Sequence, residues 1–392
     1  MACYPNAKEF RESDAIGNIK QMLTKGGAMG KRKSLRLVTM MGFIGACLIA
    51  SSYSVNAAEK VINLKFSNYY PPVAGQSKIC EDFINELEAR TNGRVKVQYY
   101  PGGSLINGPG MIKGIESGIT DIGLSHIQYT PGRMPISEAC DLPHAFPSAW
   151  VATHVVNDFY NKFKAPEWGK TKPLLIFTNT PSVLVLTKPV KTMDDLKGLT
   201  IRAPGPIGEV IKALGGSPAP TPIVETYDAM AKGVVDGAFV SSETLRTFRF
   251  AEVGKYVTQA WHVGNTYTFY ILMNKRKYDS LPPDVKEIVD KLSGEYQERM
   301  PLVWNAIDFN GVKVAKEMGV EFTELSDAEF ARWQKAASVV LDDYIARMKS
   351  AGHEEAKIKE WLAFIAERTD FWTKKQLELN IKSVTGPSEM RP

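Results

Sequence analysis

Short strand-like segments alternate with amphipathic helical segments along most of this chain, and no other feature constrains its fold as strongly. Residues 61–66 alternate apolar and polar side chains, as a strand does, and residues 95–99 predict the next strand. Between them, residues 76–90 predict a helix that ends at Asn92-Gly93. Strands that alternate with helices pack as sheets covered by helices, which predicts the α/β class. With 392 residues the chain is long enough for two domains of roughly 150 residues each.

The last third of the sequence has a different character, because long helices are expected after residues 281–283. Ser326 and Glu329 form a capping-box pattern, which predicts a helix that runs to about Lys349. A strand-like segment at residues 269–273 precedes this helical part. Since that strand comes so late, we expect the chain to cross between its two domains more than once.

The start of the chain has the three-part layout of a secretory signal. A basic cluster at residues 31–36 precedes an apolar run at residues 37–50, and small residues follow up to Ala57. The run of about 14 residues is shorter than the about 20 that a helix needs to span a bilayer. We therefore expect a signal peptide that is cleaved near Ala57 and export of the protein to the periplasm.

Two alternatives concern this leader. Met29 lies just before the basic cluster, and translation that starts there would leave residues 1–28 untranslated. Cys47 lies in a weak lipoprotein-like box, and cleavage before it would give a lipidated N-terminus. The apolar run continues beyond Cys47, which favours cleavage near Ala57 instead.

The formal net charge of +5 comes from this leader. Eight of the 48 lysines and arginines and three of the 43 acidic residues lie in residues 1–58, so the remainder of the chain is neutral. A neutral remainder lacks the basic surface that nucleic-acid binding requires, and we expect no nucleic-acid partner.

The sequence also lacks the usual catalytic and metal-binding signatures. It has no HExxH, GxSxG, GxxxxGK[ST] or CxxC motif, and its five histidines show no metal-ligand spacing. We therefore predict no catalytic residue, no metal and no cofactor. A periplasmic lyase or hydrolase that uses Glu243 and His262 is a weaker alternative, since only closeness in sequence connects the two residues. Export permits a disulfide between Cys80 and Cys140, although two separate buried thiols are favoured.

Seven short segments in a particular order are the most specific signal in the chain. They are residues 99–105, 114–123, 189–202, 213–218, 225–230, 233–238 and 252–258. This ordered series closely resembles the DctP-like extracytoplasmic solute-binding proteins of tripartite ATP-independent periplasmic (TRAP) transporters. The resemblance covers nearly all of residues 59–320.

The resemblance implies a two-lobed periplasmic binding protein fold, type II-like, with crossing strands, long C-terminal helices and a ligand enclosed between the lobes. Residues 1–57 are then the leader. The expected division gives one lobe residues 58–178 and about 267–304, and the other lobe residues 179–266 and about 305–350 with the connecting helix; residues 351–392 form C-terminal helices and a tail. Closure on a ligand is expected to bend the chain near residues 177–179 and 266–269.

The same resemblance implies the partners. A small organic acid is the ligand, and the small and large membrane subunits of a TRAP transporter receive it. The sequence leaves open a different role, that of a ligand-sensing subunit in a signalling system. A monomer and a homodimer both remain open, because residues 354–382 are expected to be helical and amphipathic enough to mediate a dimer.

Arg202 is the residue that the resemblance assigns to the ligand carboxylate. Its planar guanidinium offers two parallel hydrogen bonds, and the alternation in residues 199–202 points it away from the core of its own lobe. Many relatives that bind dicarboxylates or sialic acid carry a second arginine where this chain has Ser182, and an asparagine where it has residues 239–241. These differences favour a monocarboxylate with an aromatic or apolar body. The other candidate ligand-binding residues are Tyr69, Tyr70, His126, Phe146, Trp150, Tyr227, Phe239, Ser241 and Phe269.

Overall fold

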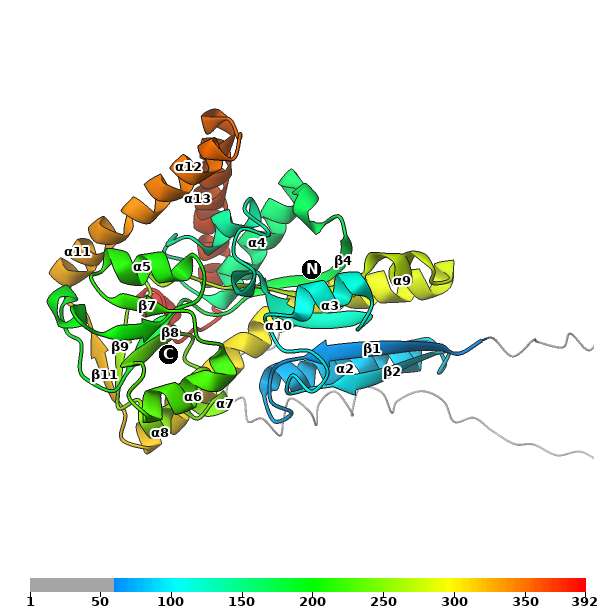
Figure 1. Cartoon of the computed structure of the whole chain (residues 1–392), viewed down its shortest axis with the longest axis horizontal. Coiled ribbons are helices and arrows are strands. Elements are labelled where there is room, and N and C mark those ends of the chain that lie inside the picture. Colours follow the sequence, from blue (N-terminus) through cyan, green and yellow to red (C-terminus); the bar gives the residue numbers. More distant parts are fainter. Residues whose placement is uncertain (1–59) are drawn as a thin grey trace, which may run out of the picture. The chain divides into compact units, whose positions relative to one another are not determined.

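The computed structural model describes residues 60–392 of the chain. The expected signal peptide, the candidate start at Met29, Cys47 and the cleavage position near Ala57 lie outside the described residues. Two β-sheets with helices packed around them make up the described part (Figure 1). This architecture confirms the predicted α/β class and the predicted two lobes.

The first lobe, lobe I, is built on a five-stranded sheet in the order β2-β1-β3-β10-β4. The first three strands of the chain are parallel, whereas β10 runs antiparallel to both β3 and β4. A strand from residues 268–274 therefore lies between strands that precede residue 179, as the late strand-like segment predicted. The strands are β1 (Ile62–Asn68), β2 (Val95–Tyr100), β3 (Ile122–His126), β4 (Thr171–Thr178) and β10 (Thr268–Asn274).

The second lobe, lobe II, is built on a six-stranded sheet in the order β11-β9-β5-β8-β6-β7. The short strand β6 pairs in parallel with β7 and β8, while β5 is antiparallel to β8 and β9. Its strands are β5 (Val183–Leu186), β6 (Thr200–Arg202), β7 (Ser217–Ala219), β8 (Gly237–Val240), β9 (Tyr256–Gln259) and β11 (Glu321–Glu324).

The two longest helices of the described residues, α10 and α13, both follow residue 282, as the sequence predicts. The α-helices are α2 (Gly75–Arg90), α3 (Met111–Ser117), α4 (Ala149–Phe163), α5 (Ile207–Ala213), α6 (Ile223–Ala231), α7 (Thr244–Thr247), α8 (Phe250–Val253), α9 (Lys275–Asp279), α10 (Pro283–Glu317), α11 (Asp327–Ala337), α12 (Val339–Ser350) and α13 (Glu355–Glu378). Short 3₁₀ turns are η1 (Ile127–Tyr129), η2 (Ser137–Asp141), η3 (Pro166–Trp168), η4 (Met193–Leu196) and η5 (Ser388–Met390).

The long helix α10 packs against elements of both lobes. It contacts α2 and β4 of lobe I and α7 of lobe II, and Figure 1 shows it running from the lobe I strands toward α7 and α8. Gly311 allows the close approach, because a Cβ atom there would lie 2.3 Å from the Ser242 carbonyl oxygen. Residues 242 and 243 therefore lie directly against α10.

Two segments, residues 179–182 and 260–267, connect the sheets, and they bond to each other. The Ser182 backbone N–H and hydroxyl both donate to the Asn265 carbonyl, at 3.0 and 2.9 Å. The Tyr267 N–H donates to Asn179 Oδ1 at 2.6 Å. Ser182, where many relatives have a second arginine, therefore binds the neighbouring crossing segment with its side chain.

The capping box at Ser326 is only half formed. The Ser326 hydroxyl accepts from the Glu329 N–H at 3.3 Å, but the Glu329 carboxylate accepts instead from the Met193 N–H and the Trp333 indole.

The single helix expected to run to Lys349 is instead two helices, α11 and α12, which meet at Ser338. The Ser338 hydroxyl donates to the Lys335 carbonyl, and such back-bonding favours a bend.

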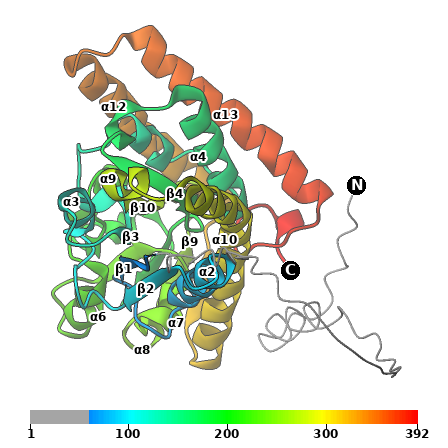
Figure 2. The same cartoon turned by 90° about the vertical axis from the view of Figure 1, so that its right-hand side faces the viewer.

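The C-terminal helix α13 packs along α4, as Figure 2 shows. Arg368 and Trp372 both donate to Asp158 Oδ2 at 2.7 Å, and the Trp372 ring stacks on His154 with centroids 4.2 Å apart. These contacts join the last long helix to lobe I.

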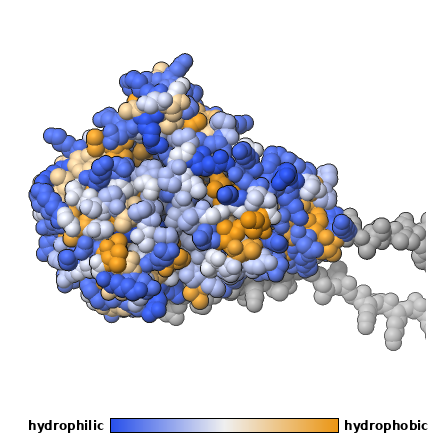
Figure 3. Space-filling model, in the orientation of Figure 1, coloured by the Kyte–Doolittle hydropathy of each residue, from blue (hydrophilic) through white to orange (hydrophobic). Residues whose placement is uncertain are grey.

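Most large apolar side chains of the described residues are buried, and the face in Figure 3 is mainly hydrophilic with scattered small apolar patches. Cys80 and Cys140 are both buried and both free, so the favoured alternative of two separate thiols is confirmed. Within residues 60–392, no helix combines the length and the apolar character that crossing a membrane requires.

Candidate functional site

Arg202 is the only lysine or arginine that is fully buried in the described residues, with 2% of its surface exposed. It ends β6, between Ala219 of β7 and Ala238 of β8, and these small neighbours leave room for its side chain. Its Nε donates to the Thr221 carbonyl at 2.9 Å, and its Nη1 donates to the Tyr267 hydroxyl at 3.3 Å. Both acceptors are uncharged.

No carboxylate of residues 60–392 pairs with the Arg202 guanidinium. A guanidinium stays protonated in proteins, so this is a buried positive charge without a negative partner. Such a charge is unfavourable unless an anion joins it. The geometry therefore suits a ligand carboxylate, which the planar guanidinium binds with two hydrogen bonds.

Two residues of lobe I lie close to Arg202. His126 ends β3 and Tyr129 lies in η1, with their ring centroids 3.9 Å apart. Burial lowers the pKa of His126, and the nearby Arg202 charge lowers it further, so the imidazole is neutral at neutral pH. His126 Nδ1 is buried and has no hydrogen-bond partner among the described residues. It is available to a ligand.

Tyr129 and Tyr267 fix the surroundings of the guanidinium. The Tyr129 hydroxyl accepts from the Ile223 N–H at 3.1 Å, which joins η1 to the start of α6. The Tyr267 hydroxyl donates to the Phe239 carbonyl at 2.8 Å, and its pKa is raised to about 12 by burial, so it stays protonated. A neutral phenol can accept from Arg202 and donate to Phe239 at once.

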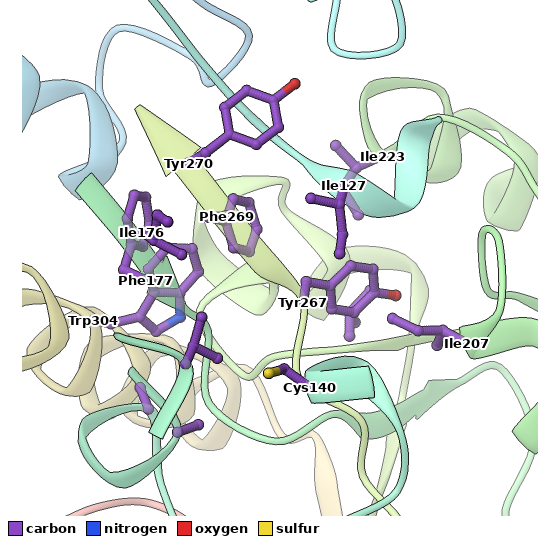
Figure 4. Close-up of a cluster of buried hydrophobic side chains, with 14 of the residues drawn as sticks. Ile127, Cys140, Ile176, Phe177, Ile207, Ile223, Tyr267, Phe269, Tyr270 and Trp304 are labelled. Carbon is purple, nitrogen blue, oxygen red and sulfur yellow. The ribbon is translucent and has the colours of Figure 1, made fainter. Parts of the chain in front are cut away.

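A row of aromatic rings from the loop after β1, from β10 and from α10 extends from Tyr267. Tyr69 and Tyr70, in the loop after β1, stack with centroids 4.5 Å apart, and Tyr70 lies 6.3 Å from Phe269. Phe269 in turn lies 4.9 Å from Trp304 of α10. Figure 4 shows Phe269 between Tyr267 and Trp304. We call the group the ring cluster; its members are Tyr69, Tyr70, His126, Tyr129, Tyr267, Phe269 and Trp304.

The crossing segment that carries Tyr267 is anchored by a buried acid. The Asp141 carboxylate accepts from the Thr268 N–H at 2.9 Å and from its hydroxyl at 2.5 Å, and Gln128 Nε2 is a further donor. Burial raises the pKa of Asp141 to about 7, against the effect of these donors. Asp141 therefore holds the first residue of β10 in place.

The structure brings five of the predicted ligand-binding residues together: Arg202, Tyr69, Tyr70, His126 and Phe269. Phe239 reaches the group through its backbone carbonyl, while its ring is buried in β8. Ser241 follows β8 and is buried, and its backbone carbonyl accepts from the Thr244 hydroxyl at 2.7 Å.

The other three predicted residues make different contacts. Tyr227 donates to Glu252 at 2.8 Å under the Arg249 guanidinium, on a half-exposed part of α6. Trp150 packs on His154 and Trp372, where α13 covers α4. Phe146 is buried beside His144. No ring contact within residues 60–392 joins any of the three to the ring cluster.

Sequence reasoning missed Tyr129, Tyr267, Trp304 and Thr221. Tyr267 had a usable signal, because it lies two residues before Phe269 and alternate residues of an extended segment share a face. Trp304 had none, since one tryptophan in a 35-residue helix gives no indication of the side it faces.

A two-lobed α/β protein with a buried cation that has no carboxylate partner in the described residues, and with aromatic rings from lobe I, a crossing segment and α10 beside it, has the features of a protein that encloses a small anionic solute. The comparison with known families is specific. The chain belongs to the bacterial extracellular solute-binding protein family 7, the DctP family, whose model matches residues 66–347. It is a TRAP-type solute-binding protein for small organic acids. Proteins of this type work with membrane subunits. The family consists of binding proteins, in agreement with the prediction that the chain is not an enzyme.

Individual relatives support the same assignment. The C4-dicarboxylate-binding periplasmic protein DctP of Rhodobacter capsulatus is 27% identical over 315 residues, which cover 78% of this chain and 93% of that protein. A TRAP periplasmic solute-binding protein from Desulfovibrio salexigens, solved in an open complex, is 31% identical with a TM-score of 0.70, over 80% of this chain and 97% of that chain. A marine metagenome TRAP solute-binding protein specific for aromatic acids, solved with 3-hydroxybenzoate, is 27% identical with a TM-score of 0.75, over 79% and 99% of the two chains.

Proposed function

We propose that this protein captures a monocarboxylate with an aromatic or apolar body and delivers it to a TRAP-type secondary transporter. The observation that carries the proposal is the single buried cation, Arg202, which has no carboxylate partner among residues 60–392 and lies beside the ring cluster. One cation balances one carboxylate. The rings offer an apolar surface for the rest of the ligand.

The absence of a second cation at this place supports a single carboxylate. Ser182 and Val240 are both buried, and the Ser182 hydroxyl is already bonded to the Asn265 carbonyl. A second carboxylate would lose its water without gaining a positive partner, at a cost of several kcal/mol. The relative solved with 3-hydroxybenzoate agrees with an aromatic acid, whereas the relative from Rhodobacter capsulatus is named for C4-dicarboxylates.

In this proposal each residue near Arg202 has a role. The guanidinium binds the carboxylate, and Tyr267 and the Thr221 carbonyl keep the guanidinium in place. His126 offers its unpartnered Nδ1 to the same end of the ligand. Tyr69, Tyr70, Phe269 and Trp304 pack against the apolar body.

Calorimetry with benzoate, phenylacetate and succinate tests the ligand class. We expect either aromatic monocarboxylate to bind at least tenfold more tightly than succinate. Tighter binding of succinate would overturn the assignment of one carboxylate. A thermal-shift screen of further organic acids extends the test, because a ligand that binds only the folded state raises the apparent stability.

A role in ligand sensing is separated from transport by the neighbouring genes. Two adjacent genes for membrane subunits support delivery to a transporter. A sensor-kinase gene in their place would support the signalling role.

A further inference from the structure

A second group of buried polar side chains lies where residues 241–244 meet α10. Glu243 and Asp308 are both buried, with 1% and 0% of their surfaces exposed. Asp308 is satisfied, since its Oδ1 accepts from the Glu243 N–H at 2.7 Å and its Oδ2 accepts from the Thr180 hydroxyl. Glu243 is not, because its Oε2 is buried and has no partner among residues 60–392.

Gln76 of α2 brings a fully buried amide from lobe I to the same place. It lies beside Glu243, yet neither its Nε2 nor its Oε1 makes a hydrogen bond of normal geometry with a described residue. The Ser242 hydroxyl is buried and unpartnered as well. A buried polar atom without a partner is destabilising, so a group of them is expected to meet a ligand atom or ordered water.

This polar group adjoins the ring cluster at Tyr70. The ring of Tyr70 lies 5.7 Å from that of Phe248, which closely follows Glu243 in the chain, and the charge of Glu243 adds to the effect of burial in raising the pKa of Tyr70. Tyr70 also contacts Trp304, with ring centroids 6.4 Å apart. Arg202, in contrast, bonds to Tyr267. The ring cluster thus has the cation at its Tyr267 side and Glu243 with Gln76 at its Tyr70 side.

We propose that Glu243 and Gln76 form a second polar subsite that binds an uncharged hydroxyl group of the ligand. The inference rests on the proposed function, because the hydroxyl belongs to the acid whose carboxylate Arg202 binds. The preferred ligand is then a hydroxylated aromatic monocarboxylate, with its hydroxyl at the Tyr70 side of the ring cluster. Asp308 is a positioning residue, which fixes Glu243 through its backbone N–H.

The chemistry of the subsite suits a hydroxyl better than a charged group. Burial raises the pKa of Glu243 to about 8. A hydrogen bond with Thr247 opposes this effect, the charge of the neighbouring Asp308 adds to it, and a weaker contact with Gln76 opposes it. The carboxyl is therefore largely protonated at pH 7 and both donates and accepts. A hydroxyl matches one donor and one acceptor, and the Gln76 amide supplies the same pair. A second carboxylate would face two buried acids, and its binding is disfavoured.

Paired ligands isolate the contribution of the hydroxyl. Calorimetry at pH 7 compares benzoate with 3-hydroxybenzoate and phenylacetate with 3-hydroxyphenylacetate on the full exported chain. We expect the hydroxylated member of at least one pair to bind about five- to tenfold more tightly, as one well-placed hydrogen bond provides. Gln76→Leu and Glu243→Leu should reduce this ratio to about one. Both should leave the affinity for the unhydroxylated acid within threefold.

Two further variants act as controls. Glu243→Gln keeps a donor and an acceptor at the same place and should retain most of the preference for the hydroxyl. Gln259→Leu removes another amide whose Oε1 is buried and unpartnered, in β9, and should leave the ratio unchanged. A thermal melt of each variant verifies folding.

The outcomes separate this inference from the proposed function. Equal affinities within each pair in the wild type, or a ratio that survives both leucine variants, overturn the hydroxyl subsite while Arg202 keeps its role. Tighter binding of 3-(aminomethyl)benzoate than of 3-hydroxybenzoate also overturns it, in favour of a cationic group beside Glu243. Failure of all four acids to bind overturns the proposed function, and the subsite with it.

Discussion

The Arg202 guanidinium lies 3.3 Å from the hydroxyl of Tyr267, which itself donates to the Phe239 carbonyl. Arg202 ends a strand of lobe II, whereas Tyr267 immediately precedes β10, the lobe I strand to which the chain returns. The cation that we assign to the ligand is therefore bonded to a segment that connects the lobes. A movement of the lobes about this segment would change the surroundings of the cation.

Replacement of Arg202 by alanine should weaken ligand binding strongly. The ligand carboxylate would be buried without its partner, at a cost of about 2–5 kcal/mol, which corresponds to a loss of roughly 30-fold to a few thousand-fold. Arg202→Lys should recover only part of this, because an ammonium cannot form the planar pair of hydrogen bonds. Calorimetry with the best-binding acid measures both. Binding by Arg202→Ala within threefold of wild type would contradict the carboxylate assignment.

Replacement of Arg202 also leads to a second, independent prediction, which concerns the ligand-free protein. Removal of a residue from a structural ion pair lowers the stability of the folded protein. Arg202, in contrast, is a buried charge with no carboxylate partner in the described residues. Arg202→Met, which keeps much of the side-chain volume, should therefore leave the melting temperature unchanged or raise it. A fall of the ligand-free melting temperature by more than several degrees would indicate a structural role.

Tyr267→Phe should weaken binding by about tenfold, because the guanidinium loses the acceptor that orients it and the Phe239 carbonyl loses its donor. Tyr270→Phe is the matched control, since Tyr270 is also buried in β10 but points to the opposite side from Phe269 (Figure 4). Equal effects of the two substitutions on calorimetric affinity would show that Tyr267 acts only through general packing.

The local elements could be predicted because their signals lie within a few neighbouring residues, whereas Arg202 was assigned through the resemblance of residues 189–202 to a family motif. The alternation around residues 61–66 and the late strand at residues 269–273 both correspond to strands of the structure. The alternation in residues 199–202 predicted that Arg202 points away from the core of its own lobe. Arg202 is nonetheless buried, because residues of the crossing segment and of lobe I cover it.

The remaining candidate residues could not be sorted from the sequence, since their surroundings come from distant segments. Trp150 and Tyr69 are both aromatic residues in or near loops, and nothing local distinguishes them. Trp150 is covered by Trp372, more than two hundred residues later, whereas Tyr69 lies near His126 and Tyr129. The Glu243–Gln76 pair depends in the same way on the approach of α10 at Gly311.

Ligand binding should close the two lobes. Tyr69 and His126 of lobe I lie near Arg202 of lobe II, and all three are buried, so a ligand can reach them only when the lobes separate. We expect bending at the crossing segments, near residues 177–179 and 266–269. Small-angle scattering should show a smaller radius of gyration at saturating ligand than without it. An identical profile in both states would argue against closure.

The buried acids and histidines of the described residues give the stability a defined pH dependence. Burial raises the pKa of Asp141 and Asp308 to about 7 and that of Glu243 to about 8. A raised carboxyl pKa means that the folded state holds protons that the unfolded state has released. The free energy of unfolding therefore falls as the pH rises toward the folded pKa. Burial lowers the pKa of His144 and His154 to about 4, which has the opposite effect, but only below the usual histidine value of 6.5.

We therefore expect the free energy of unfolding of the ligand-free protein to fall as the pH rises from 6.5 to about 8, where the acids act alone. Each acid contributes up to about 1.4 kcal/mol per pH unit while its folded form remains protonated. Urea unfolding at closely spaced pH values measures this free energy.

Glu243→Gln isolates the contribution of one acid, because the amide resembles the protonated acid and does not ionise. The difference in unfolding free energy between this variant and the wild type should move in favour of the variant as the pH rises from 5 to 8, since the histidine contributions cancel in the comparison. A difference that stays constant over this range would mean that Glu243 is ionised in the folded protein already at pH 5.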